Sequence, residues 1–175
     1  MTARPAGRNT LSAAELDELL ARPIVGRLAT VRADGWPSVV PVWVEWDGTV
    51  AWVIARAASR YVEDIRREPR VCLSVVDDAD PDRRVQLFAR AMVVAEAAPL
   101  GGASLAMARR MAERYEGSAG LAYIERSREW PRIIIQLQPE RVVSWTSPDW
   151  HARYRSDDMP GPTEPPTDPS EEPRP

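Results

Sequence analysis

The sequence predicts a mainly β protein with flanking helices, of the α+β class. Asp34-Gly35 and Asp47-Gly48 each separate two segments rich in Val, Thr and Trp. Asp-Gly supplies the positive φ angles that a tight hairpin needs, so each pair predicts a turn between strands. We expect three strands in an antiparallel meander, over residues 27–32, 38–46 and 49–56.

Length and composition predict one globular domain. The chain has 175 residues, 44% apolar and 28% charged, which is typical of one folded core and not of a disordered or membrane protein. No apolar run approaches the ~18 residues of a membrane span. Residues 1–9 carry two Arg but no apolar signal core follows them, so we expect a cytoplasmic protein.

The end of the chain differs in composition from the rest. Residues 157–175 contain seven Pro and six acidic residues, a composition that buries too little apolar surface to offset ordering. We expect a disordered tail there, a flexible N-terminus over 1–10, and one folded domain over 11–156. The tail carries a net charge of −5, which leaves +2 on the remainder of a chain whose net charge is −3.

Helix signals flank the strands. Ser12 and Glu15 form a capping-box pattern, and Pro23 ends the helix that follows it. Ser59 is the expected N-cap of a second helix over 60–67, before Pro69. The remaining pattern predicts strands over 71–76, 85–96, 132–138 and 141–145, the last two separated by Pro139, and a helix over about 100–115. Residues 118–129 fit no single class.

The second predicted strand has two different faces. Val40, Val42, Val44 and Trp46 alternate with Val39, Pro41, Trp43 and Glu45, so the first set is expected to face the core. Pro41 lacks a backbone N–H, which places it on an edge or at a bulge. A ligand or a partner subunit could approach such a face.

Several kinds of site are excluded by composition. All 23 basic residues are Arg, which excludes Schiff-base chemistry. One His (His151) and one Cys (Cys72) make a zinc site or a His-dependent triad improbable, and we expect no metal. There is no GxGxxG or Walker loop, and a pI near 5.3 indicates no nucleic-acid partner. The acidic loop 77–82 is expected to be a solvated connection.

The best candidate site lies where the third strand meets the second helix. Arg56, Ser59 and Arg60 surround the predicted helix start, whose free N–H groups favour an anion. Guanidinium forks bind phosphate well. Spacing alone predicts an ordinary capped helix with exposed Arg equally well.

The order of these segments carries a resemblance to a known family. GRLATVRADGWPSVVPVWVEWDG, then a strand, then SRYVEDIRREPRVCLSVVDD, and later PERVVSW, resemble the pyridoxamine 5′-phosphate oxidase-like split β-barrel superfamily, in its flavin/deazaflavin oxidoreductase branch. The resemblance implies a six-stranded antiparallel split β-barrel of the FMN-binding type. It also implies a homodimer with cofactor sites at the subunit interface.

The resemblance implies roles for nine residues. Arg56, Ser59 and Arg60, beside Tyr61, would hold the cofactor phosphate, and the ring would be lined by Pro41, Val42, Trp43, Ile54 and Ala55. No side chain is expected to be a catalytic acid or base, because the cofactor carries the hydride. Relatives commonly have Lys at the position of Tyr61 and Asn at that of Asp64.

Three functions remain open at this point. The leading hypothesis is an enzyme that transfers a hydride between the reduced deazaflavin coenzyme F-420 and an unsaturated small organic substrate. The first alternative is an FMN-dependent oxidase or reductase of the same fold. The second is a non-catalytic cofactor- or ligand-binding dimer in which Tyr61 and Asp64 have replaced the usual phosphate contacts.

Overall fold

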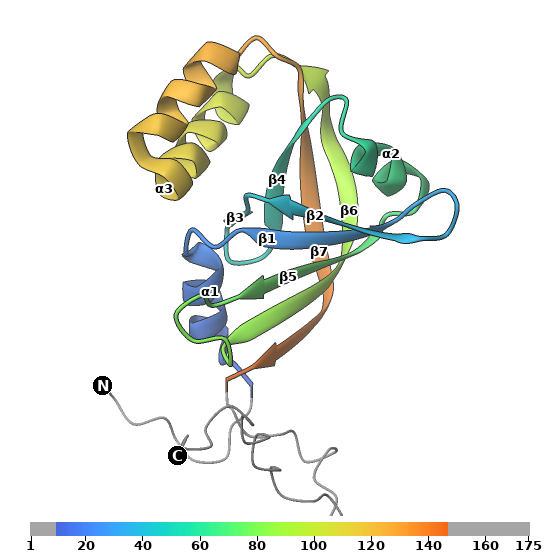
Figure 1. Ribbon diagram of the computed structural model, residues 1–175, viewed down its shortest axis with the longest axis vertical. Helices are drawn as coiled ribbons and strands as arrows, with labels where there is room; N and C mark the ends of the chain where they lie inside the picture. The colour runs from blue at the N-terminus through green and yellow to red at the C-terminus, as the bar shows by residue number, and fades with distance from the viewer. Residues whose placement is uncertain (1–9, 147–175) are drawn as a thin grey trace, which may run out of the picture.

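The computed structural model describes residues 10–146, which form three helices and seven strands. Figure 1 shows the helices around one curved sheet. The predicted tail, the N-terminal segment and His151 lie outside the described residues. The elements in chain order are α1 Ala13–Ala21, β1 Gly26–Val31, β2 Pro37–Val42, β3 Glu45–Trp46, β4 Ala51–Arg56, α2 Arg60–Arg67, β5 Arg70–Val76, β6 Arg84–Ala98, α3 Gly102–Ser127 and β7 Arg132–Trp145.

The strands form one open, seven-stranded sheet, in the order β2-β1-β5-β6-β7-β4-β3. All neighbouring strands are antiparallel. The α+β class is therefore confirmed, but the expectation of a six-stranded barrel is wrong. The predicted second strand is interrupted after Val42, so β3 is a separate strand of two residues. Strands β2 and β3 form the two edges of the sheet and do not pair with each other.

The predicted three-strand meander is also wrong. Both Asp-Gly turns form, with Gly35 at φ 84° and Gly48 at φ 94°, and β1 pairs with β2. However, β4 pairs with β3 and β7, far from β2 in the sheet. The reason is the break at Val44. Its N–H donates to the Tyr115 hydroxyl at 3.1 Å and its carbonyl accepts from Arg114, so α3 satisfies groups that a continuous strand would pair.

The main hydrophobic core is formed by the sheet together with α1 and α2. Val42 and Val44 are buried in it, and Val40 and Trp46 pack against it, so the predicted inward face is confirmed. Pro41 lies on β2, which is an edge strand as its missing N–H requires. Side chains from five strands and two helices are at most 2% exposed there: Leu19, Leu28, Val53, Ile65, Leu73, Leu87 and Ile135.

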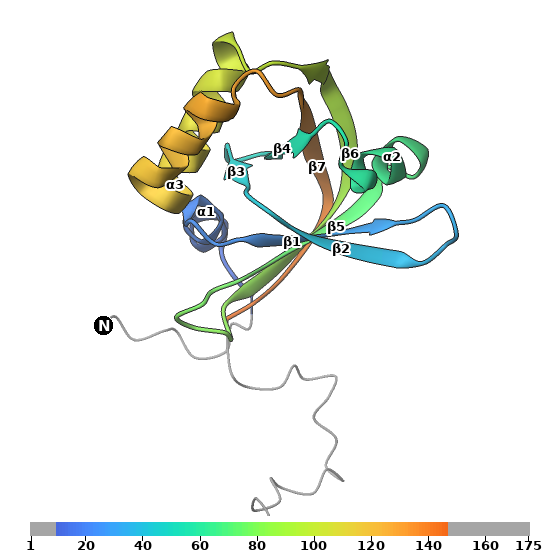
Figure 2. The ribbon, with the colours of Figure 1, turned by 45° about the horizontal axis from the view of Figure 1, so that its top comes forward.

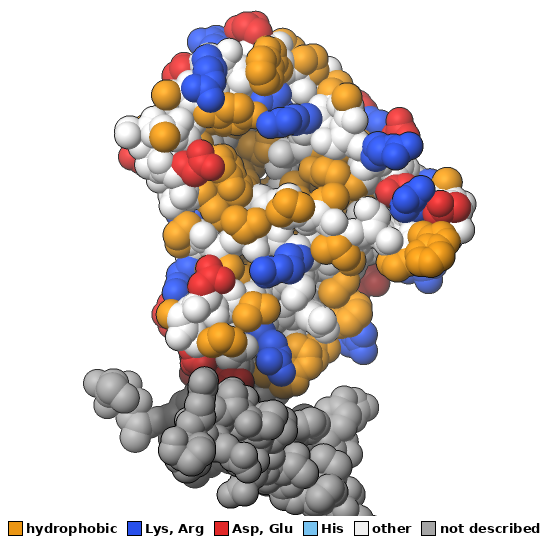
Figure 3. Space-filling view, viewed as in Figure 1, with side chains coloured by type: hydrophobic (Ala, Val, Ile, Leu, Met, Phe, Trp, Pro, Cys, Tyr) orange, Lys and Arg blue, Asp and Glu red, His pale blue; other side chains and the backbone are white. Residues whose placement is uncertain are grey.

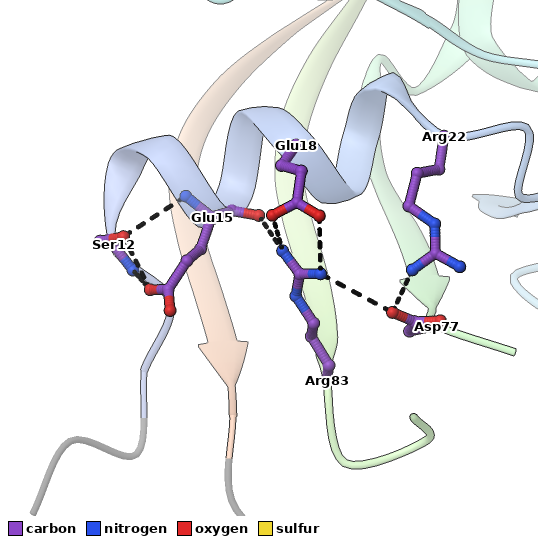
Figure 4. Close-up of polar contacts among 6 residues, drawn as sticks. All are labelled: Ser12, Glu15, Glu18, Arg22, Asp77 and Arg83. Atoms are coloured by element: carbon purple, nitrogen blue, oxygen red, sulfur yellow. Dashed lines mark hydrogen bonds and ion pairs between the residues drawn. The ribbon is translucent and has the colours of Figure 1, made fainter. Parts of the chain in front are cut away.

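The capping box of α1 is present as predicted. The Glu15 N–H donates to the Ser12 hydroxyl at 3.3 Å, and the Ser12 N–H donates to the Glu15 carboxylate at 2.7 Å. Figure 4 shows both contacts at the first turn. They satisfy backbone donors that a helix start otherwise leaves free.

The acidic loop between β5 and β6 is tied to α1, in contrast to the expected solvated connection. Asp77 is 3% exposed; it accepts a hydrogen bond from Arg22 and lies 3.8 Å from Arg83. Arg83 also pairs with Glu18 of α1 at 2.9 Å. Burial alone would raise the pKa of Asp77, but the Ala79 N–H and the two guanidinium groups outweigh it and lower that pKa below the ordinary value of an Asp carboxyl.

Helix α3 is two arms joined at a kink. Gly117 has φ 59° and ψ −136°, which ends one arm and starts the next. A Cβ at Gly120 would lie 2.3 Å from the Ala112 carbonyl oxygen, so the arms touch through backbone. The predicted helix 100–115 is therefore longer, and residues 118–127 form its second arm. Figures 1 and 2 show α3 standing beside the sheet as a separate lobe.

Strand β7 runs through Pro139 without a break, in contrast to the two strands predicted. The sheet absorbs the proline at a bulge, because Phe88 pairs with Arg141 and the next residue, Ala89, pairs with Pro139. Glu140 is the extra residue. Among residues 10–146, no helix is long and apolar enough to cross a membrane.

Candidate functional site

A cavity of about 490 Å³ lies between α3 and strands β2 and β4. This volume is in the range of small-molecule sites, about 300–1,000 Å³. Figure 3 shows the hollow between the α3 lobe and the strands, rimmed largely by hydrophobic side chains. Its lining residues are Pro41, Val42, Trp43, Ile54, Arg56, Ser59, Tyr61, Leu100, Ala108, Met111, Glu116, Tyr123, Ile124 and Arg132.

The structure gathers seven of the nine predicted site residues around this cavity, all except Ala55 and Arg60. Ala55 is 1% exposed and packs in the main core, because it alternates with Ile54 and Arg56 along β4. Arg60 lines a separate groove of about 300 Å³, together with Asp34 and Asp64. The start of α2 thus points Ser59 and Arg60 to different sides.

One wall of the cavity is apolar. Trp43 stacks on Tyr115 of α3 with ring centroids 5.2 Å apart and 13° between the ring planes. Trp43 and Ile54 also pack against a second hydrophobic cluster that includes Leu100, Ala108 and Ile124. A flat ligand ring would find aromatic and branched side chains here.

Tyr115 holds α3 to the start of the sheet. Its hydroxyl donates to the Ile24 carbonyl at 3.0 Å and accepts from the Val44 N–H at 3.1 Å. Burial raises its pKa, so the phenol is neutral and keeps the proton it donates. The apolar wall is therefore anchored by two backbone segments that are not neighbours along the chain.

Another part of the cavity lining, its cationic end, carries two arginines. Arg56 of β4 and Arg132 of β7 donate to the same oxygen, the Tyr123 hydroxyl, at 3.2 and 3.3 Å. Arg132 also donates to the Ser127 hydroxyl at 3.2 Å and to the Trp130 carbonyl at 3.2 Å. Because Arg56 and Arg132 are paired across the sheet, their side chains share one face.

The two phenols that line the cavity differ in acidity. Burial alone would raise the pKa of Tyr123, but the hydrogen bond from Arg56 and the charges of Arg132 and Arg56 outweigh it and lower that pKa. Burial raises the pKa of Tyr61 to about 12, because no cation compensates. Tyr61 therefore offers a neutral hydroxyl to the cavity, whereas the Tyr123 hydroxyl is more acidic because it lies beside the guanidinium groups of Arg56 and Arg132.

Ser59 occupies the predicted N-cap position of α2 but does not cap it. Its backbone is extended and its side chain makes no capping hydrogen bond. Its carbonyl accepts from the Val62 N–H at 3.0 Å, so the helix begins through backbone contacts. The Ser59 hydroxyl, at the cavity wall, is available to a ligand.

Comparison with known proteins places this geometry in a family. The family model for pyridoxamine 5′-phosphate oxidase matches residues 12–146. The chain belongs to the pyridoxamine 5′-phosphate oxidase family. No curated protein matches the chain significantly.

Solved structures agree with this family membership. An F420 reductase is 28% identical, covers 73% of this chain and 94% of its own, and superposes with a TM-score of 0.55. A conserved hypothetical protein from Mycobacterium tuberculosis is 25% identical, with coverages of 82% and 89% and a TM-score of 0.65. The heme storage protein HutZ from Vibrio cholerae, 18% identical with coverages of 75% and 93%, shows the shared fold with a TM-score of 0.57.

Several lining residues of this family member were missed at the sequence level. Tyr123 and Ile124 lie in the segment that fits no single pattern, and Leu100 and Met111 come from the other part of the α3 region. For Arg132 the sequence gives one local indication, because it directly follows Pro131 and begins a predicted strand. Pairing of that strand with β4, which sequence periodicity does not reveal, brings it to Arg56.

Proposed function

We propose that the chain is an oxidoreductase that binds a phosphate-bearing flavin-type cofactor in the cavity, with the deazaflavin coenzyme F-420 as the leading candidate. The observation that carries the proposal is the cavity itself, whose lining combines an apolar wall at Trp43 with the guanidinium groups of Arg56 and Arg132. The 28% identity to an F420 reductase supports the choice of cofactor.

The lining residues fit such a group. Pro41, Val42, Trp43 and Ile54 offer an apolar surface to a ring, with Tyr61 beside them. Arg56 and the uncapped Ser59 hydroxyl would hold the phosphate. The Ala55 side chain lies in the core, so this residue would contact a cofactor only through its backbone. Arg60 lines the neighbouring groove and is not part of the proposed phosphate site.

The cofactor, when bound, supplies the hydride for an unsaturated small organic substrate. The protein's part is to bind, orient and exclude water. Leu100, Met111 and Ile124, all from the α3 region, make the cavity wall that faces β2 and β4 and would contact the substrate. Substrate choice then depends on the α3 region.

We also propose that the protein acts as a homodimer. Large hydrophobic side chains remain exposed on β6, on β7 and on the β1–β2 hairpin: Met92, Val94, Val142, Trp36 and Val39. Exposed apolar surface of this kind is typical of an interface. Sedimentation equilibrium is expected to give twice the chain mass of 19.6 kDa; a monomer at micromolar concentration would contradict this.

An FMN-dependent oxidase or reductase is the second candidate, because both cofactors present a ring and a phosphate to the same groups. Anaerobic titration with FMN and with F-420 distinguishes them, since the bound cofactor is identified by its own absorbance. Tighter binding of FMN than of F-420 would identify FMN as the cofactor.

Tyr61 motivates a third candidate, a binding protein without turnover. Its neutral phenol stands at the cavity where relatives commonly carry a Lys ammonium group. Tyr61→Lys is the diagnostic variant. If wild type binds neither cofactor and the Lys variant binds one, the non-catalytic hypothesis is favoured; tight wild-type binding with turnover supports the enzyme.

A further inference from the structure

We infer that Arg132 and Arg56 together form an oxyanion-binding site at the cationic end of the cavity, and that the Tyr123 hydroxyl holds the place that the ligand's oxyanion takes. The site itself is argued from the residues; that its ligand is the phosphate of a flavin-type cofactor rests on the proposed function. Arg132 thus replaces Arg60 as the second arginine of the grip.

Arg132 is a buried charge without a carboxylate partner. It is 6% exposed and lines the cavity, and within residues 10–146 no carboxylate lies within 4.0 Å of its guanidinium. Its contacts are neutral groups: the Trp130 carbonyl and the hydroxyls of Ser127 and Tyr123. Burying an unneutralised cation is costly, so such a group normally faces an anion.

The nearby acidic side chains are engaged elsewhere or lie at the kink of α3. Glu125 pairs with Arg109 at 2.7 Å and Glu129 pairs with Arg128 at 3.2 Å. Glu116 is the carboxylate that lines the cavity, but it precedes the Gly117 kink. Tyr123 lies six positions after that kink, about 9 Å along the helix axis. The protein therefore leaves the cationic end uncompensated.

The sheet adds a second, independent reason. Register pairs Arg56 directly with Arg132 across β4 and β7, so two like charges share one face. Like charges directly opposite each other destabilise a sheet. Because Arg56 also has no carboxylate partner among the described residues, an anion between the two arginines would relieve this repulsion.

Tyr123 marks the position for that anion. Both guanidinium groups donate to its one oxygen, which uses both of its acceptor sites. Two converging donors suit the oxygens of a phosphate or carboxylate better than one phenol. Two positive charges favour a phosphate group over a neutral part of a ligand.

FMN and riboflavin test this site, because they differ in the phosphate. We expect wild type to bind FMN at least about tenfold more tightly than riboflavin, as charge-assisted hydrogen bonds allow. Arg132→Lys should reduce this preference at least about threefold while riboflavin affinity changes less than about twofold, because the charge stays and the planar fork is lost. Arg60→Gln is the matched control and should keep the preference. An unchanged preference in Arg132→Lys, or its loss in Arg60→Gln, would overturn the inference.

Tyr123→Phe separates a placeholder from a structural role. Removing the competing hydroxyl should increase the stabilisation that phosphate ligands give, measured as the rise in Tm with inorganic phosphate or phenyl phosphate against chloride at equal ionic strength. A purely structural hydroxyl predicts an equal or smaller rise. Circular dichroism checks that each variant is folded.

The same thermal assay keeps the test independent of the cofactor proposal. If wild type binds neither FMN nor riboflavin but is stabilised by phosphate, and Arg132→Lys is not, the proposed function fails while the anion site stands. Phenyl phosphate and benzoate distinguish the two oxyanions. No stabilisation of wild type by either anion would overturn the site itself.

Discussion

Trp43 and Tyr115 stack with ring centroids 5.2 Å apart, which joins the end of β2 to the first arm of α3. This contact lies where the backbone leaves the sheet, and the Tyr115 hydroxyl bonds there to Val44 and Ile24. The break in the strand and the apolar wall of the cavity thus have one cause. An uninterrupted strand over 38–46 would leave α3 without this attachment.

Tyr115→Phe is expected to lower the free energy of unfolding by about 1–2 kcal/mol, because it leaves the Val44 N–H and the Ile24 carbonyl without a partner. The stack with Trp43 is retained, so the loss reports the hydroxyl. Urea denaturation measures it. Glu113→Gln is the control, since Glu113 is an exposed residue of the same helix. Equal stability of wild type and Tyr115→Phe would show that water replaces these bonds.

Gly120→Ala is expected to destabilise α3 by about 1–3 kcal/mol. Its Cβ would lie 2.3 Å from the Ala112 carbonyl oxygen, and backbone on both sides cannot yield without separating the arms. Gly101→Ala is the matched control, because a Cβ there meets nothing within 4 Å and φ is −152°. Thermal unfolding of both variants measures the difference. Similar Tm values for the two would contradict the close approach.

The two predicted N-caps should respond differently to alanine. Ser12→Ala removes a capping box and should cost about 0.5–2 kcal/mol of stability. Ser59→Ala should cost less than about 0.5 kcal/mol, because its hydroxyl caps nothing, while cofactor affinity falls. Urea denaturation and cofactor titration read these effects separately. Equal losses of stability would contradict the difference between the two caps.

Asp77 predicts a pH dependence of stability. Its folded pKa is lowered below the ordinary value of an Asp carboxyl, so its contribution is present above the unfolded pKa of about 3.9 and is lost as the pH falls through the folded pKa. Asp77→Asn should therefore lower the free energy of unfolding at pH 7 and flatten its decline below pH 4. Urea denaturation at several pH values measures both. A variant with the same acid decline as wild type would show that other carboxylates are responsible.

Local signals predicted much of this fold. The Asp-Gly turns, the Ser12–Glu15 capping box and the prolines that end α1 and α2 are determined by neighbouring residues, and the structure confirms each of them. The inward face of β2 was predicted from the alternation of Val40 and Val42 with Val39 and Pro41 along the strand. Such features need no knowledge of what lies across the molecule.

The errors concern contacts between distant segments. The meander failed because Arg114 and Tyr115, about 70 residues away, bond to the backbone of Val44. The second arm of α3 depends on a turn at Gly117, which ordinary helix patterns do not predict. The site shows the same division: the β4–α2 turn was identified from local sequence, whereas Arg132 and Tyr123 reach it through strand pairing and helix packing.

The most direct test of the account is titration of the purified chain with F-420 and with FMN, followed by tryptophan fluorescence in wild type and Trp43→Phe. We expect saturable binding of one cofactor per chain, with quenching that is largely lost in Trp43→Phe because Trp43 lines the cavity. Arg56→Gln should weaken binding about tenfold or more. Wild type that shows no saturable binding of either cofactor would contradict the central claim.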